Sequence, residues 1–514
     1  MLQCNLPFFL WGLYHSEGAF VFILEINGTH MSYSRFFTIF LALLLVSTAF
    51  WSCRDDAIDS DPSLRLEFSR DSLLFDTVFT TLGSATRSFK VYNRHSQRIR
   101  ISTVRLAEGS QSYYRMNVDG RSGTVLHDID IEARDSIFVF VEVTVDPVNQ
   151  NLPLTIVDSI EFNTNQNIQD VKLVAWGQDA HFIHPNYTDP ESGIEYHIIT
   201  EDTQWTADLP YVIYGLAVVA PDITLRVEEG ARIHFHNNAS LVFLARSSFK
   251  AEGSADQPVV FQGDRLESFY QEQPGQWGRI WLTATSKDHV IDHAIIKNGT
   301  VGLHVDTLGH ATQPTLQISN SIIKNMSLAG LFAQGSHVVA ENLAIANCGQ
   351  YALLLTLGGH YDFRHTTIAN YYRIDIRNTP SVLLNNYYED IDGNIQVRPF
   401  EHLFFGNTII YGNNQEEIFF NLYEGTSADF TFDHCLIRTQ MDTTPDAFIN
   451  TLVNQDPLFN DTQLHDFRLT EESPAIGAGN PDIAFEIPYD LAGNDRTERT
   501  DVGALQYVPI EEEQ

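Results

Sequence analysis

The 514-residue sequence predicts an all-β protein with two folded parts, an antiparallel sandwich followed by a solenoid of stacked parallel strands. Two observations predict this. Between residues 63 and 180, short runs alternate apolar and polar residues and are separated by turn-forming clusters, as half-buried strands require. Beyond residue 290, six segments carry Asn or His followed three residues later by Ile. A column of like residues at a recurring interval is typical of a solenoid.

Composition limits the partners of the chain. It has 31 basic and 66 acidic residues, a formal net charge of −35. So much negative charge opposes binding to the phosphate backbone, so we expect no nucleic-acid partner. The charge suits a soluble extracytoplasmic protein, and we expect a monomer.

Residues 31–52 have the form of an export signal. Arg35 supplies positive charge, and the mostly apolar run after it is shorter than the ~20 residues of a membrane-spanning helix. The signal ends before Cys53, and an acidic pair follows that cysteine closely. This arrangement resembles the signals of Bacteroidetes-type surface lipoproteins. The resemblance implies that Cys53 is lipid-acylated, that 53–62 is a linker, and that the protein is anchored in the outer membrane by lipid alone.

Residues 1–30 lack a comparable basic start. We expect them to be an upstream extension outside the native protein, with Met31 as the true first residue.

The first folded region is expected at 63–180. Its alternating runs include 88–92 and 137–143, with turn signals at 119–120 and 146–147. This order of strands resembles the immunoglobulin-like sandwiches of bacterial surface proteins, which usually serve as spacers. Residues 181–210 contain three prolines and are expected to be a linker.

The repeats predict the geometry of the second region. The six pairs are His293-Ile296, Asn320-Ile323, Asn342-Ile345, His365-Ile368, Asn407-Ile410 and His434-Ile437. In the first four, a second Asn follows two residues after Ile: Asn298, Asn325, Asn347 and Asn370. We expect the isoleucines to point inward and to stack from coil to coil. Asn tolerates left-handed backbone, so the Asn/His column is predicted to form a corner rather than a metal or catalytic site.

The start and end of this region carry a family resemblance. Residues 225–235, 249–253 and 259–261 form short strands around Gly and Pro turns. They resemble the opening coils of right-handed parallel β-helix proteins of the pectin-lyase type, which implies such a fold over 211–454. The motifs Asp456-Pro457-Leu458-Phe459 and Ser473-Pro474-Ala475-Ile476-Gly477 resemble the C-terminal capping segment of secreted bacterial β-helix proteins. We therefore expect a cap over 455–510 that covers the last coil.

Two insertions are the candidate binding sites. The larger, Tyr371 to Phe400, fills the 42-residue interval between His365 and Asn407. Its aromatic, acidic and basic side chains suit a sugar, because rings pack on the apolar face and charged groups bond hydroxyls. The candidate ligand-binding residues are Tyr371, Tyr372, Arg373, Tyr387, Tyr388, Asp390 and Asp392. The smaller insertion, 264–278, contains Phe269, Tyr270 and Trp277.

The leading hypothesis is non-catalytic recognition of a glycan, or adhesion, at the cell surface. The resemblance also implies an alternative, a polysaccharide lyase or glycoside hydrolase, in which calcium would accompany carboxylates. No catalytic motif aligns with this sequence, so no catalytic residue, metal ligand or cofactor is assigned. A purely structural surface protein is the third hypothesis. Cys348 and Cys435 fall at different corners of different coils and are expected to be buried thiols without a disulfide.

Overall fold

The computed structural model describes residue 58 and residues 60–79, 84, 86–144, 154–310 and 312–509. The upstream extension 1–30, the leader 31–52 and Cys53 lie outside the described residues. Within that part of the chain the protein is almost entirely β, with one α-helix, α2 (Pro481–Glu486), and two single-turn 3-10 segments, Gly109–Gln111 and Ser268–Tyr270. No helix among these residues is long and apolar enough to cross a membrane.

The first region consists of two five-stranded sheets. One contains β1 (Glu67–Phe68), β3 (Arg87–Tyr92), β8 (Ser136–Val143), β5 (Tyr114–Val118) and β6 (Arg121–Gly123), in that order. The other contains β2 (Ser72–Phe79), β10 (Asn167–Gln178), β9 (Leu154–Thr164), β4 (Ile99–Leu106) and β7 (Val125–Ile131). The pairs are antiparallel, as expected, except that β2 runs parallel to β10. Their inward residues form one buried core that includes Val91, Ile101, Val139 and Phe162.

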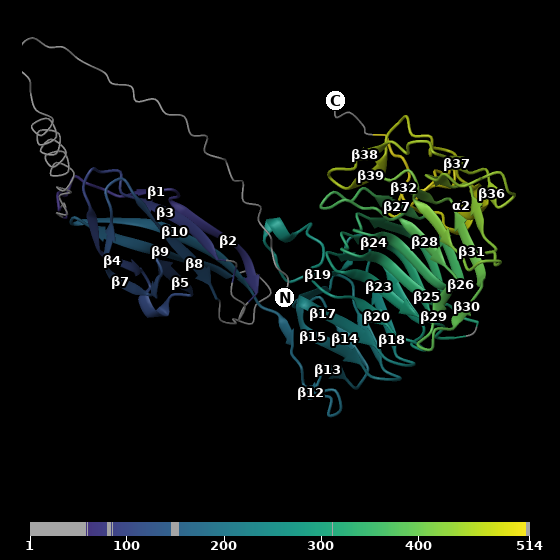
Figure 1. Cartoon of the computed structure of the whole chain (residues 1–514), viewed down its shortest axis with the longest axis horizontal. Coiled ribbons are helices and arrows are strands. Elements are labelled where there is room, and N and C mark those ends of the chain that lie inside the picture. The colour runs from purple at the N-terminus through teal and green to yellow at the C-terminus, as the bar shows by residue number, and fades with distance from the viewer. Residues whose placement is uncertain are drawn as a thin grey trace, which may run out of the picture.

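The second region is one sheet of 25 strands in which nearly all neighbours are parallel (Figure 1). The chain winds so that each strand pairs with strands one turn earlier and one turn later, and we call each turn a coil. The strands form three ladders. The first ladder contains β13 (Glu195–Ile199), β15 (Tyr211–Val219), β17 (Arg232–Phe243), β20 (Ile280–Leu282), β23 (Val301–Asp306), β25 (Ala329–Ala346), β26 (Tyr351–Arg364), β28 (Val382–Asn385) and β33 (Ile418–Asn421).

The other two ladders complete each coil, and the long strands β15, β17, β24, β25 and β26 each contribute to more than one ladder. The second ladder contains β14 (Thr203–Trp205), β16 (Thr224–Val227), β18 (Ser248–Glu252), β21 (His289–Asp292), β24 (Leu316–Lys324), β31 (Phe400–Gly406), β34 (Thr431–Asp433) and β36 (Phe448–Ile449), with β25 and β26. The third ladder contains β11 (His181–Ile183), β19 (Val259–Gly263), β22 (Ala294–Lys297), β27 (Thr367–Asn370), β32 (Ile409–Gly412), β35 (Leu436–Ile437) and β37 (Leu452–Val453), with β15, β17, β24 and β25. Three short pairs lie beside them, β12 (Tyr187–Thr188) on β13 and the hairpins β29 (Tyr387–Glu389) to β30 (Ile395–Val397) and β38 (Phe459–Asp461) to β39 (Asp466–Leu469).

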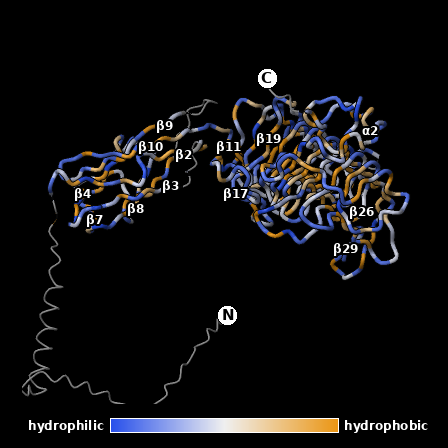
Figure 2. The backbone as a smooth tube through the Cα atoms, turned by 90° about the horizontal axis from the view of Figure 1, so that it is seen from above, coloured by the Kyte–Doolittle hydropathy of each residue, from blue (hydrophilic) through white to orange (hydrophobic). Residues whose placement is uncertain are grey.

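The six isoleucines form one file through the core, as predicted. Each is the direct register partner of the next, from Ile296 to Ile437, and all six are fully buried. Figure 2 shows apolar residues concentrated inside the coils. A second inward file of rings, Phe363, Phe405, Phe432 and Phe448, stacks at centroid distances of 4.9 to 5.3 Å and ends in the last coil. Phe448, the last ring of this file, is half-buried and packs against the core.

The Asn/His column forms the predicted corner. All six residues have φ between 46° and 51°, in the left-handed region, and Asn450 (φ 46°) adds a seventh that the pattern search missed. Their side chains bond between coils: the Asn342 amide donates to Asn320 Oδ1 at 2.9 Å, and the Asn407 amide donates to His365 Nε2 at 3.0 Å. In the second column Asn298, Asn325 and Asn347 are also left-handed, but Asn370 is not.

One boundary differs from the sequence-based expectation. Residues 181–210, expected to be a linker, contribute β11, β12, β13 and β14 to the large sheet, since Tyr196, Ile198 and Ile199 align in register with strand β15. The prolines in this stretch suggested a linker. Pro210, however, directly precedes a strand, a position where the missing N–H is tolerated.

The closing segment packs along the outward side of the third ladder, where its cluster includes Leu452 of the last coil. Its Leu469, Ala475 and Val502 pack with Ile409 and Leu436, which face outward from the third ladder. It also bonds the Asn/His corner, where Gly503 O accepts from His365 Nδ1 at 3.3 Å.

Candidate binding face

The structure divides the predicted site residues of the larger insertion into two groups. Tyr371 packs against Phe459 and Phe467 of the hairpin β38–β39, at ring-centroid distances of 6.2 and 6.3 Å, and burial raises the pKa of its hydroxyl. Arg373 Nη2 donates to Thr462 Oγ1 at 3.2 Å, and the neighbouring Tyr372 is half-buried. This group therefore attaches the closing segment to the coils.

The second group lies on the hairpin β29–β30, which stands away from the coils (Figure 2). Tyr387 donates to Asn421 Oδ1 at 3.4 Å, and Tyr388 is exposed. Asp390 closes the turn, because its Oδ1 accepts the backbone N–H of Asp392 at 3.1 Å and that of Asn394 at 2.8 Å. The hydrogen bond from Gln396, together with these backbone bonds, lowers the pKa of Asp390.

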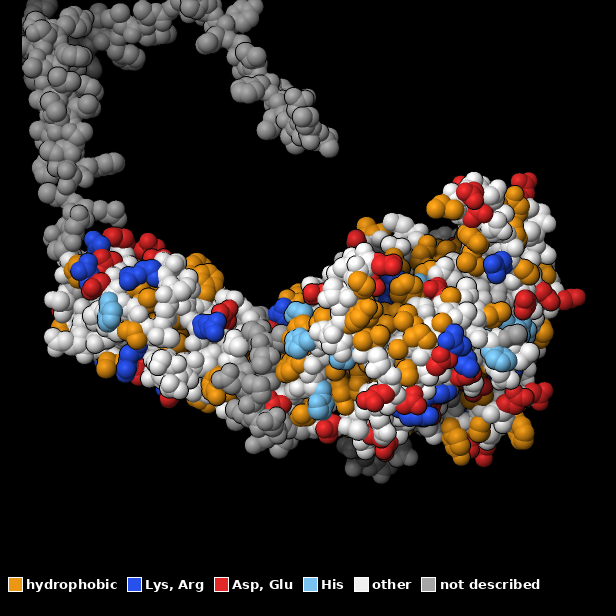
Figure 3. Space-filling view, turned by 90° about the horizontal axis from the view of Figure 1, so that it is seen from below, with side chains coloured by type: hydrophobic (Ala, Val, Ile, Leu, Met, Phe, Trp, Pro, Cys, Tyr) orange, Lys and Arg blue, Asp and Glu red, His pale blue; other side chains and the backbone are white. Residues whose placement is uncertain are grey.

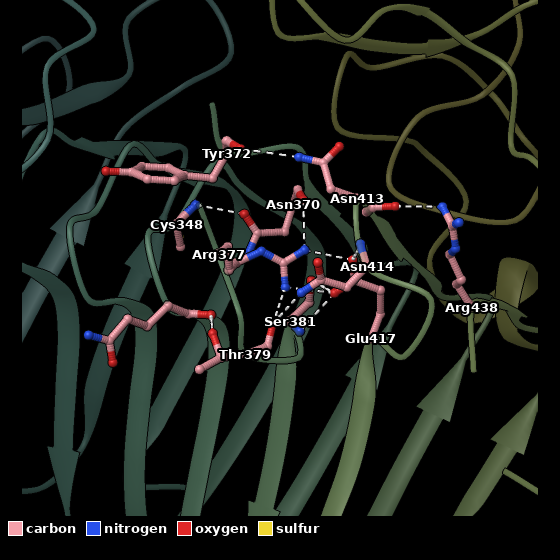
Figure 4. A network of polar contacts seen from close by, with 12 residues as sticks. Cys348, Asn370, Tyr372, Arg377, Thr379, Ser381, Asn413, Asn414, Glu417 and Arg438 are labelled. Atoms are coloured by element: carbon pink, nitrogen blue, oxygen red, sulfur yellow. Dashed lines mark hydrogen bonds and ion pairs between the residues drawn. The ribbon is translucent and has the colours of Figure 1, made fainter. Parts of the chain in front are cut away.

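A buried ion pair anchors the insertion between these groups (Figure 4). Arg377 donates to both carboxylate oxygens of Glu417, at 2.6 and 2.8 Å, and both side chains are at most 1% exposed. Glu417 also accepts from the N–H and the hydroxyl of Ser381 and from the N–H of Asn414, at 2.6 to 2.9 Å. Apart from Arg377 Nε, which is buried without a hydrogen-bond partner, the charged groups of this pair are bonded inside the protein, so the pair is structural.

The smaller insertion is also largely structural. Trp277 is fully buried, stacks on Phe235 at 4.2 Å, and donates Nε1–H to Lys297 O. Partial burial alone would raise the pKa of Glu272. Hydrogen bonds from His465 and Asn325, and the charge of Lys324, outweigh it and lower that pKa to about 2.

A different surface has the features of a binding site, the outward face of the first ladder. One outward position is apolar or aromatic in every coil and forms an unbroken file by direct register: Ile198, Val218, Val242, Trp281, His304, Phe332, Leu354, Leu383 and Phe419. We call this the outward file. Figure 3, a view from below, shows groups of hydrophobic side chains between charged ones on the surface of the coiled region. Val218, Val242, His304 and Leu354 of this file are buried and Phe419 is exposed. A run of nine apolar or aromatic residues at outward positions is unusual, because polar residues are expected there.

A groove of about 550 Å³ borders the first part of the outward file. Leu216, Val242 and Trp281 form its apolar floor, and Tyr196 and Arg279 contribute polar groups at its sides. One face of the Trp281 indole stacks on His304, with the ring planes 3° from parallel and the centroids 5.5 Å apart. The indole face that borders the groove is therefore the opposite one.

Polar side chains fix the rings beside the groove. His304 Nδ1 accepts from Arg279 Nη1 at 3.1 Å, and His304 Nε2 lies 2.9 Å from Gln334 Oε1 and 3.1 Å from Asp306 Oδ1. Since arginine can only donate, His304 carries its proton on Nε2. Asp306 also accepts the Trp281 Nε1–H at 2.7 Å. Burial opposes ionisation of Asp306, but the bonds from His304 and Trp281 and the charge of Arg279 outweigh it and lower its pKa.

Sequence reasoning missed this face, although a signal was present. Trp281, His304 and Phe332 occupy the same outward position in successive coils, 23 and 28 residues apart. These intervals are close to the 22 to 27 residues that separate most neighbours in the Asn/His column. No single residue type marks the outward file, so a search for identical residues does not find it.

Comparisons with known proteins assign no family to this chain. No family model matches it, and no curated protein matches it. Among solved structures, a family 123 glycoside hydrolase from Clostridium perfringens, studied for glycolipid glycan hydrolysis, is 7% identical. The alignment covers 24% of this chain and 31% of that chain, about a third of its length, with a TM-score of 0.17. The seventh PapD-like domain of human CEP192 is 13% identical over 25% of this chain and 94% of that domain, with a TM-score of 0.16. Scores this low carry no argument about fold or function.

Proposed function

We propose that this chain is a surface lipoprotein whose large sheet is a right-handed parallel β-helix, and that it recognises a glycan without catalysis. The observation that carries the proposal is the outward file with its groove at Trp281. The winding of the chain and the inward file of isoleucines support the β-helix assignment.

The shape and chemistry of the face favour a linear glycan. The outward file continues through nine positions, so an extended polymer would contact several coils at once. Its apolar groups suit the C–H faces of sugar rings, and Arg279, Asp306 and Gln334 lie beside them to bond hydroxyls.

Recognition is favoured over catalysis because the polar groups bond one another. Both ring nitrogens of His304 are engaged, and Asp306 accepts from two donors. A general base needs a free lone pair directed at its substrate. The lyase or hydrolase alternative predicts that the protein releases unsaturated or reducing products, and product analysis separates the two hypotheses.

The lipid anchor belongs to the same proposal. Acylation of Cys53 would hold the protein at the outer membrane, since each buried methylene contributes roughly 0.8 kcal/mol. We expect Cys53→Ala to abolish incorporation of labelled fatty acid and to release the protein from membranes. A Cys53→Ala protein that still carries the label would exclude this anchor.

The binding test compares three variants on a panel of immobilised polysaccharides. We expect Trp281→Ala to weaken retention by up to about tenfold, because a lost aromatic contact is worth roughly 0.5–1.5 kcal/mol. Arg279→Gln should also weaken retention, because it removes a charged hydrogen-bond donor. Tyr388→Ala, on the separate hairpin, should bind like the wild type. Weakening by Tyr388→Ala alone would move the site to the larger insertion, and unchanged binding by all three variants would refute both locations.

A further inference from the structure

We propose that the sandwich, which the sequence marks only as a spacer, carries a second and independent saccharide site. The site is a cavity of about 470 Å³ on the outer face of the sheet that contains β5 and β8. Its lining includes Thr86, Arg115, Asn117, Phe140 and Glu142. This volume lies within the ~300–1,000 Å³ of ordinary small-ligand pockets. The inference goes beyond the proposed function, which concerns the coils alone.

An exposed ring forms the apolar wall of this cavity. Phe138 and Phe140 are successive outward residues of β8, 44% and 43% exposed, with ring centroids 5.8 Å apart and planes within 19° of parallel. The ammonium of Lys90 lies over the Phe138 ring at 4.6 Å. The ring of Phe140 instead borders the cavity. An exposed phenylalanine in the middle of a sheet is not required for folding, because its neighbours Val139 and Val141 supply the core contacts.

Polar groups surround this ring on the paired strands. Asn117 and Ser88 are the register partners of Phe140 on either side, and Arg115 is the partner of Glu142 on the same face. Arg115 and Glu142 pair through their backbones, but among the described residues neither side chain makes a hydrogen bond or an ion pair. A cation and an anion that face each other across two strands without pairing are available to a ligand.

These features fit a pyranose sugar. Its C–H face would pack on Phe140, while its hydroxyls would accept from the Arg115 guanidinium and donate to the Glu142 carboxylate. A purely apolar occupant would leave both charges desolvated and unpaired, which is unfavourable. A peptide is the competing occupant, and the experiment includes it.

The test measures binding of the full extracytoplasmic chain to soluble xylo-, cello- and malto-oligosaccharides, to oligogalacturonides, and to a random peptide library. We expect Phe140→Ala and Arg115→Gln to weaken binding of at least one sugar series about tenfold. Phe138→Ala is the matched control, because it lies on the same strand, is equally exposed and does not line the cavity; it should stay within twofold of the wild type. All three residues lie at the surface, and circular dichroism checks that the variants fold.

The outcomes are distinguishable from those for the coils. If Phe140→Ala weakens sugar binding by the same factor in the wild-type chain and in the Trp281→Ala variant, the sandwich site is separate from the site on the coils. The inference is overturned if Phe140→Ala binds every sugar series like the wild type, if Phe138→Ala weakens binding equally, or if only peptides show Phe140-dependent binding. Failure of Trp281→Ala to alter binding would instead contradict the proposed function and leave this site standing.

Discussion

The buried ion pair between Arg377 and Glu417 provides the sharpest test of how the larger insertion is held. Glu417→Gln keeps the shape of the side chain but replaces one acceptor oxygen with an NH2 group. The wild-type carboxylate accepts five hydrogen bonds from three residues, Arg377, Ser381 and Asn414. The amide group would face donors, and Arg377 would remain buried without a counter-charge. Breaking a buried pair in this way costs about 3–5 kcal/mol.

An exposed pair with nearly the same geometry serves as the control. Arg246 Nη2 lies 2.7 Å from Asp222 Oδ2, against 2.6 Å in the buried pair, but its side chains are 56% and 62% exposed. Asp222→Asn should therefore cost less than about 1 kcal/mol. The distance and the charges of the two pairs are matched, whereas burial and the three further hydrogen bonds to Glu417 are present only in the first pair.

Urea unfolding, followed by near-ultraviolet circular dichroism, measures both losses, and hydrogen exchange locates them. Exchange should accelerate in β28 and the start of β33, which Glu417 joins through Ser381. The double variant Arg377→Met/Glu417→Leu should recover most of the loss, because it leaves no unpaired charge. Equal losses in Glu417→Gln and Asp222→Asn would refute the reasoning.

Three further predictions concern the coils. Burial lowers the pKa of His234 to about 4 and that of His289 to about 3. Below pH 6.5 the unfolded chain therefore binds more protons than the folded one, so the free energy of unfolding should fall by ~2 kcal/mol per histidine between neutral pH and pH 5. Urea unfolding at several pH values measures this loss. Asn342→Ala should destabilise the protein by about 1 kcal/mol more than Asn342→Gly in urea unfolding, because alanine disfavours the φ of 50° at this corner. Burial raises the pKa of Cys348 to about 12 and raises that of Cys435, so neither thiol should react with Ellman's reagent until urea unfolds the protein; rapid reaction of the native chain would contradict their burial.

Much of the fold was predictable because stacked coils repeat their constraints. The column from His293 to His434 recurs since every coil needs a left-handed corner at the same place, and the isoleucines recur since each contacts the next. The order of the two regions was predictable because alternating apolar and polar residues in the first part of the chain give way to repeated Asn/His and Ile positions in the second. The side position of the closing segment did not follow, because its contacts with Ile409 and Leu436 use outward residues that sequence alone does not distinguish from inward ones.

The candidate sites were harder to predict, because their roles depend on contacts between residues that are far apart in the sequence. Asp390 and Tyr371 have residue types that suit ligand binding, yet one closes a turn and the other packs under a hairpin. The outward file depends on register across coils of unequal length. Arg377 and Glu417 are 40 residues apart, and nothing local in the sequence indicates that they meet.

The closing segment has a consequence for how the coils come apart. It bonds Asn342, His365, Asn407 and Asp433, residues of four successive coils, through Tyr489, Gly503 and Asn480. Repeat arrays without such a clasp tend to fray from their ends, one unit at a time, because each unit touches only its neighbours. A strap that spans four units couples them, so these coils should melt as a single cooperative block.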